Sequence, residues 1–186
     1  MMKTKRFIVP FLLLSLFCLP YPSSGQSAPQ AYTKANQLFA QGYYREAISS
    51  YQLLLASPSR DLDRGFLHTR IADSYFHLTD YTHAIEAYRR ALTVQKISEQ
   101  AQTQYWIGFS ALLLGRNDEA VVEFLKIPEA YPGSGMWVGT AYYWAGRASE
   151  RMGRKEQAAA FYRKAGGSGK STQERFAMKK AEGVKK

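Results

Sequence analysis

Gly169, Lys170 and Ser171 have the residue types and the order that close a phosphate-binding loop. In such a loop, backbone N–H groups of a glycine-rich turn between a strand and a helix form a cradle for phosphate. The opening glycine would have to be residue 164, which is Lys164, and this segment follows a predicted helix instead of a strand. We therefore interpret the stretch from Lys164 to Ser171 as a linker.

The histidines and carboxylates have no spacing that is typical of a reactive site. His68, His77 and His83 are the only histidines, and they are not arranged to put two metal ligands on one helical face. Asp118 and Glu119 stand where helix-start charges are expected, and no Ser, His and Asp set stands out. The sequence therefore predicts no metal site, no cofactor and no catalytic residue.

Residues 1–28 have the pattern of a secretory signal peptide. Three basic residues precede an apolar run from Phe7 to Leu19, which is followed by prolines and small polar residues. The run includes Pro10 and is shorter than the roughly 20 apolar residues that span a bilayer. We expect cleavage after Gly25 or Ala28, no membrane span after cleavage, and a periplasmic or secreted protein.

The single cysteine, Cys18, lies within this leader. Phe17 stands where a lipobox would carry a small residue, so lipidation is not expected. The mature chain would then have no thiol for a disulfide or a nucleophile, and its stability must come from packing.

The net charge of +10 is concentrated at the two ends of the chain. Residues 29–162 contain 14 basic and 13 acidic residues, whereas residues 163–186 contain 8 basic and 2 acidic residues. Nucleic-acid binding needs basic side chains gathered along one face, so a nearly neutral body argues against that function. The basic tail is interpreted as a solvated terminus.

Four segments repeat one pattern of small and large residues. A small residue on a first helix is followed twelve positions later by a second small residue, and four positions after that by a ring. Opposed small residues allow two helices to approach closely, and the ring fills the space between neighbouring hairpins. The three columns are Ala35, Ala72, Gly108 and Gly146; Ala47, Ala84, Ala120 and Ala158; and Tyr51, Tyr88, Phe124 and Tyr162. The turns carry Gly42, Thr79, Gly115 and Gly153, which predicts a left-handed conformation there.

This pattern resembles the tetratricopeptide repeat, and it covers Ala31 to Gly166. The resemblance implies an all-α fold, an α-solenoid of four helix-turn-helix hairpins in residues 29–170 with a C-terminal capping helix and basic tail in 171–186. The units would span about 31–58, 65–95, 101–131 and 138–166. Ser171 and Glu174 could form the capping box of the last helix. Pro128 departs from the pattern, and we expect it to kink or shorten its helix.

In this family, ligands lie along the inner surface made by the first helices. An aromatic lining there suits an extended peptide or an amphipathic helix. The bases of the family's carboxylate-clamp members are replaced by Tyr32, Thr69 and Tyr105, so binding of an acidic tail is not expected. Alternatively, Phe76 and Phe109 pack as core. The resemblance places these residues in the groove: Tyr32, Asn36, Phe39, Thr69, Asp73, Phe76, His77, Tyr105, Phe109, Tyr143, Arg147 and Arg151.

The fourth unit is similar to the helical domain of soluble lytic murein transglycosylases and to envelope coordinators built from tetratricopeptide repeats. No catalytic domain is expected in this chain. The leading hypothesis is a noncatalytic periplasmic adaptor for cell-envelope assembly or maintenance, with an envelope protein or peptide segment as partner. The alternative is a noncatalytic accessory of peptidoglycan metabolism that contacts glycan or a murein enzyme.

Overall fold

The computed structural model describes residues 28–58, 61–167 and 172–184. Residues 1–27 of the predicted signal peptide, which include Cys18, and the residues Lys170 and Ser171 of the linker lie outside this part of the chain. In the described ranges the regular structure is nine α-helices with no strand, which confirms the all-α prediction. The helices are α1 (Ala28–Ala40), α2 (Tyr44–Ala56), α3 (Arg64–His77), α4 (Tyr81–Leu92), α5 (Ile97–Leu113), α6 (Asn117–Ala130), α7 (Gly135–Arg151), α8 (Lys155–Gly166) and α9 (Thr172–Gly183).

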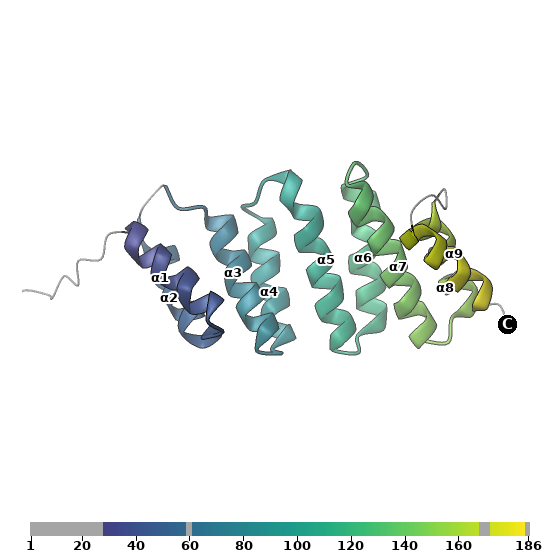
Figure 1. Cartoon of the computed structure of the whole chain (residues 1–186), viewed down its shortest axis with the longest axis horizontal. Coiled ribbons are helices and arrows are strands. Elements are labelled where there is room, and N and C mark those ends of the chain that lie inside the picture. The colour runs from purple at the N-terminus through teal and green to yellow at the C-terminus, as the bar shows by residue number, and fades with distance from the viewer. Residues whose placement is uncertain (1–27, 59–60, 168–171, 185–186) are drawn as a thin grey trace, which may run out of the picture.

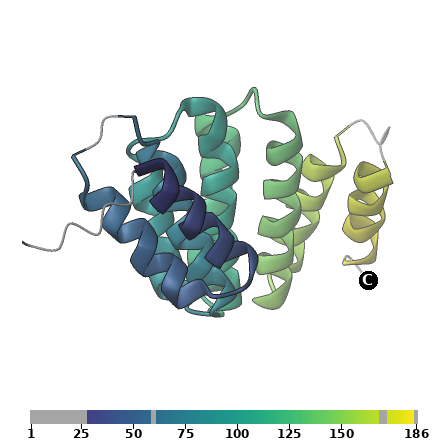
Figure 2. The same cartoon turned by 60° about the vertical axis from the view of Figure 1, so that its left-hand side comes forward.

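The helices stack in chain order, each one chiefly on the helix before it and the helix after it. Figure 1 shows four hairpins side by side along the long axis, with α9 at the C-terminal end, and Figure 2 shows the same order from another side. A hairpin of two amphipathic helices cannot bury its apolar surface alone, so stacking creates the core. The predicted α-solenoid is confirmed. None of the helices in the described ranges is long and apolar enough to cross a membrane.

Left-handed turns join the two helices of every hairpin. The φ angles are +81° at Gly42, +60° at Thr79, +75° at Gly115 and +72° at Gly153. The residue after each of these donates its N–H to a carbonyl five positions back, as in the 2.9 Å bond from Tyr43 to Leu38. This bond is typical of a Schellman helix end. The prediction of left-handed turns is confirmed, including the one at a threonine.

All twelve residues of the small and large columns are buried. In the third and fourth hairpins the ring of the second helix lies against the small residue of the first helix. A Cβ atom added to Gly108 would lie 2.8 Å from the Phe124 ring, and one added to Gly146 would lie 2.7 Å from the Tyr162 ring. Phe124 and Tyr162 therefore require the glycine that each of them faces.

Of the two effects expected at Pro128, a kink or a shortened helix, the shortening is not observed. Helix α6 continues to Ala130 and has 14 residues, while α2, α4 and α8 have 13, 12 and 12. Proline removes only one N–H donor, and Pro128 stands in the last turn, so few helical bonds are lost. The N–H group of Tyr131 still donates to the carbonyl of Ile127 at 2.8 Å.

Candidate functional site

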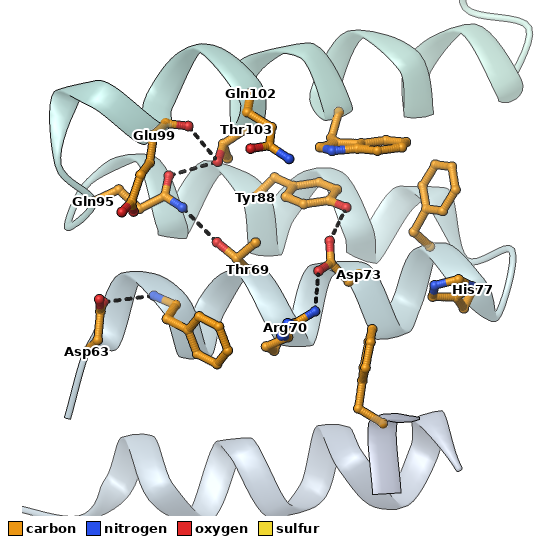
Figure 3. Close-up of a pocket in the computed structure, with 14 residues that line it drawn as sticks. Asp63, Thr69, Arg70, Asp73, His77, Tyr88, Gln95, Glu99, Gln102 and Thr103 are labelled. Atoms are coloured by element: carbon orange, nitrogen blue, oxygen red, sulfur yellow. Dashed lines mark hydrogen bonds and ion pairs between the residues drawn. The ribbon is translucent and has the colours of Figure 1, made fainter. Parts of the chain in front are cut away.

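A pocket of about 460 Å³ opens on the inner face, between α1, α3 and α5. Figure 3 shows α3 crossing its centre, with α5 on one side and α1 on the other. Helix α3 supplies more of the lining than any other helix because its inward face is shared by both neighbours. Five of the residues predicted for the groove line it, namely Phe39, Thr69, Asp73, Phe76 and His77.

Arg70 lies in the middle of the pocket, between two rings. Its guanidinium carbon is 4.8 Å from the ring centre of Phe39 on α1 and 4.8 Å from that of Phe66 on α3. Contacts of this kind favour a cation electrostatically. The Nη1 atom of Arg70 is also 3.5 Å from Asp73 Oδ2. The rings and the carboxylate together fix the orientation of the arginine.

Asp73 is hydrogen-bonded to a tyrosine of α4, the second helix of its hairpin. The hydroxyl of Tyr88 on α4 donates a 2.7 Å hydrogen bond to Asp73 Oδ1 (Figure 3). Burial raises the pKa of Asp73, although the bond from Tyr88 and the charge of Arg70 act in the opposite direction. Burial, together with the charge of Asp73, raises the pKa of Tyr88 far above its ordinary value. Each carboxylate oxygen of Asp73 therefore has a partner within the chain, Tyr88 for one and Arg70 for the other.

Gln95 joins three elements at one side of the pocket. It follows α4, and its Nε2 donates to Thr69 Oγ1 at 2.7 Å. The Thr103 hydroxyl of α5 donates to Gln95 Oε1 at 2.8 Å. Figure 3 shows this chain of bonds crossing from α3 to α5. The hydroxyl groups of Thr69 and Thr103 therefore already have a partner within the chain. Through Gln95 they connect α3 to α5.

Other polar groups of the pocket are open to a ligand. The Gln102 side chain of α5 is exposed, and among the described residues no hydrogen-bond partner is found for its amide. The Trp106 indole, one turn along α5, is half-buried beside it. Asp63 caps α3 by accepting the Phe66 N–H at 2.9 Å, and Glu99 stands in the first turn of α5. The pocket thus combines an amide, an aromatic wall and carboxylates.

Two aromatic residues of α5 that were predicted for the groove do not line this pocket. Tyr105 is only 9% exposed. The centre of its ring lies 5.2 to 5.9 Å from the ring centres of Trp106, Phe109, Phe124 and Trp137. Burial raises its pKa to about 12. Phe109 is half-buried, with its ring 4.8 Å from that of Trp144. These rings form the core between the third and fourth hairpins because Trp137 and Trp144 of α7 cover them.

The predicted groove residues of the fourth hairpin also have structural contacts. The Tyr143 ring lies 5.7 Å from Tyr162 and 6.1 Å from Phe176 of α9, so the capping helix borders it. Arg147 Nε is 3.8 Å from Glu150 Oε2, and Arg151 Nη1 donates to the Leu112 carbonyl at 3.2 Å. At this end of the array, the predicted groove is replaced by contacts among α5, α7, α8 and α9.

Tyr32 and Asn36 of the first hairpin lie beside the pocket instead of lining it. The Tyr32 ring is 5.7 Å from that of Phe66. Asn36 Oδ1 accepts a 2.8 Å hydrogen bond from the Tyr51 hydroxyl, so this amide oxygen already has a partner within its own hairpin.

Sequence reasoning missed Phe66, Arg70, Gln102 and Trp106, and a simple signal could have found them. Phe66 and Gln102 stand three positions before the predicted residues Thr69 and Tyr105, and Arg70 and Trp106 stand three positions before the predicted residues Asp73 and Phe109. Residues at these offsets share a helical face with the predicted column. Widening the column to its helical neighbours would have included all four.

Acidic and histidine side chains do not gather into a metal site here. In residues 28–58, 61–167 and 172–184, no group of three or more His, Cys, Asp or Glu side chains is arranged to hold a metal ion.

Comparison with known proteins gives two matches to family models described as tetratricopeptide repeat, over residues 69–135 and 139–165. Among solved structures, the apo form of RapI superimposes with a TM-score of 0.72 at 13% identity, covering 85% of this chain and 48% of RapI. This chain thus spans about half the length of RapI.

Two further structures are covered over most of their own length. YrrB, described as a TPR protein with an unusual peptide-binding site, has a TM-score of 0.62 at 21% identity, covering 82% of this chain and 75% of YrrB. MamA from Desulfovibrio magneticus RS-1 has a TM-score of 0.62 at 16% identity, covering 86% of this chain and 92% of MamA. At these identities the likeness concerns the fold alone.

Proposed function

Because this chain is a tetratricopeptide-repeat protein, we propose that it is a noncatalytic scaffold that holds a partner protein by an extended segment in the pocket between α1, α3 and α5. The partner would be a protein of the cell envelope, reached after export. Such a scaffold acts by localising its partner or by holding the partner in one conformation.

The observation that carries the proposal is that the pocket has a polar group and an aromatic surface available to a ligand. An extended peptide needs a group that pairs with its main chain and an apolar surface for alternate side chains. The exposed Gln102 amide can donate to and accept from a peptide group, and the half-buried Trp106 indole beside it offers an apolar wall. The Arg70 and Asp73 pair behind them is fixed, so the site is preorganised.

The likeness to YrrB supports the choice of ligand class at the level of the fold. Its description names a peptide-binding site, and the two chains share the helical stack at 21% identity. That likeness concerns the ability of such a helical stack to hold a peptide. The residues that would bind a peptide here are those of the pocket between α1, α3 and α5.

The envelope location rests on the first residues of the chain. Lys3, Lys5 and Arg6 followed by an apolar run are typical of an export signal. A chain that carries such a signal would meet its partner outside the cytoplasm.

Photo-crosslinking in living cells tests this function. A photoreactive amino acid replaces the exposed Gln102 of the pocket, and the matched control replaces Gln157, an exposed glutamine on α8. We expect one discrete protein adduct from position 102 and none from position 157. Equal labelling from both positions, or no protein adduct from position 102, would contradict the proposal.

The same cells test the alternative function. Peptidoglycan is sedimented with the bound protein, and a charge-matched protein serves as control. Cosedimentation that is lost on replacing Trp106 with Ala, together with no protein adduct from position 102, would favour a glycan-binding accessory instead.

A further inference from the structure

We infer that the pocket selects extended segments in which a lysine or arginine stands a few residues from an aromatic or aliphatic residue, with the basic side chain directed to the end formed by Asp63 and Glu99. This inference rests on the proposed function and specifies the chemistry of the partner segment. It follows from how charge and aromatic surface are distributed in the pocket.

The cation and the anion at the centre of the pocket neutralise each other. Arg70 is 3.5 Å from Asp73, and its faces are covered by Phe39 and Phe66. Asp73 already accepts hydrogen bonds from Tyr88 and from Arg70. The centre therefore contributes little net charge to the selection of a ligand.

The unmatched charge of the pocket is negative. Asp63 and Glu99 both line it, and among the described residues neither has a basic side chain within ion-pair distance. Asp63 uses one oxygen to cap α3 and has the other free of any partner found in the described chain. A positively charged segment thus meets two carboxylates, whereas an acidic segment would be repelled by them.

The charged end and the aromatic end are separate. Figure 3 shows Asp63 and Glu99 where α3 and α5 begin, and His77 at the far end of the pocket. The rings of Phe76 and Trp106 meet edge to face at 5.1 Å and line the pocket between α3 and α5. A ligand that satisfies both parts must carry a base and, a few residues along, an apolar side chain. An extended strand separates such residues by about 3.3 Å per position.

Three fluorescent ten-residue peptides, acetylated and amidated, test the inference. The first has two lysines and two phenylalanines in a Gly and Ser background. In the second, both lysines are replaced by Glu, and in the third both phenylalanines are replaced by Ser. Binding to the protein purified after expression of the full chain is followed by fluorescence anisotropy, at low and at moderate salt.

The protein variants remove charge without removing structure. Asp63→Asn keeps a good cap, since Asn is as favourable as Asp at this position, and Glu99→Gln keeps the shape of the side chain. The matched control is Glu46→Gln with Glu129→Gln, which removes two exposed carboxylates outside the pocket. Circular dichroism and thermal melting check that all variants remain folded.

We expect the lysine and phenylalanine peptide to bind about tenfold or more tightly than the glutamate peptide, with weaker binding at higher salt. The double variant D63N and E99Q should lose most of this preference, and E46Q with E129Q should keep it. Loss of binding by the serine peptide would show that the aromatic surface is used as well.

Equal or tighter binding of the glutamate peptide overturns the inference, and so does an unchanged preference in the double variant. Absence of measurable binding by all three peptides overturns it too. The proposed function is judged separately, because a protein adduct from position 102 would still establish the pocket as a protein-binding site when the cationic preference fails. No adduct from that position would instead refute the function itself.

Discussion

The hydroxyl of Tyr88 donates to a carboxylate oxygen of Asp73 at 2.7 Å, and the same relationship recurs in two other hairpins. Tyr51 donates to Asn36 at 2.8 Å, and Tyr162 donates to Glu150 at 2.7 Å. In each hairpin the ring of the second helix is buried, while its hydroxyl holds a polar residue of the first helix. The third hairpin has Phe124 at the same position, so there the ring alone suffices.

Replacing Tyr88 with Phe should therefore leave packing intact and remove one bond to a largely buried carboxylate. We expect the free energy of unfolding, measured in urea, to fall by about 1–3 kcal/mol. Tyr51→Phe is the matched control because its acceptor, Asn36, is neutral, and its loss should be about 0.5–1.5 kcal/mol. A smaller loss for Tyr88→Phe than for Tyr51→Phe would contradict this account.

Glu123 should make stability depend on pH in the acid range. Burial acts to raise its pKa, but hydrogen bonds from Lys126, Gln104 and Arg89 outweigh burial and lower the pKa below 4.5. The unfolded chain then takes up the proton first, so the stabilisation is present above pH 4.5 and is lost as the pH falls through the folded pKa. Glu123→Gln should lower the free energy of unfolding by about 1–3 kcal/mol at pH 7 and flatten its decline toward pH 3.

Urea unfolding at a series of pH values measures this effect. The curves of the wild type and of Glu123→Gln should converge at acid pH. Glu129→Gln, at an exposed position of the same helix, should run parallel to the wild type. Parallel curves for Glu123→Gln would refute the role of the Glu123 network in acid stability.

Two glycines of α7 should respond in opposite ways to an added methyl group. Gly146→Ala would place Cβ 2.7 Å from the buried Tyr162 ring, and we expect a loss of about 1–3 kcal/mol from overpacking. Gly139→Ala has its nearest neighbour, the Ala165 carbonyl, at 3.8 Å, and should gain about 0.5–1 kcal/mol from helix propensity. Thermal melting distinguishes the two, and equal shifts of either sign would count against the packing model.

Thr79 has a φ of +60°, a conformation that costs a threonine energy and a glycine almost none. Thr79→Gly should therefore raise the free energy of unfolding by about 0.5–1 kcal/mol, after the greater entropy of glycine in the unfolded chain is subtracted. The reverse substitution, Gly115→Thr, should lower it. Destabilisation by Thr79→Gly would mean that the bond from the Thr79 hydroxyl to the Leu78 carbonyl outweighs the backbone strain.

Much of the fold could be predicted because its determinants are local. The burial of the small residues Gly146 and Ala158 and the turn at Gly153 follow from steric rules that act within one hairpin. Even Thr79 could be assigned a left-handed turn, because its place in the repeat is that of the glycines.

The site could be predicted only in part because exposure depends on neighbours outside the repeat columns. Thr69 and Tyr105 stand in one column, yet Thr69 lines the pocket and Tyr105 is covered by Trp137 of the next hairpin. Tyr143 is bordered by Phe176 of α9, which has no counterpart in the repeat. The stacking of Arg70 between Phe39 and Phe66 joins two hairpins, and a pattern confined to one unit cannot reveal it.

Because each helix packs chiefly on its chain neighbours, the relative positions of α1, α3 and α5 are set largely by their packing on α2 and α4. Small rotations at the α2/α3 and α4/α5 interfaces add along the stack and change how far α1 and α5 stand from α3. A segment that touches all three helices would resist those rotations and stiffen the first three hairpins. We expect the width of the pocket to follow the rotations at these two interfaces.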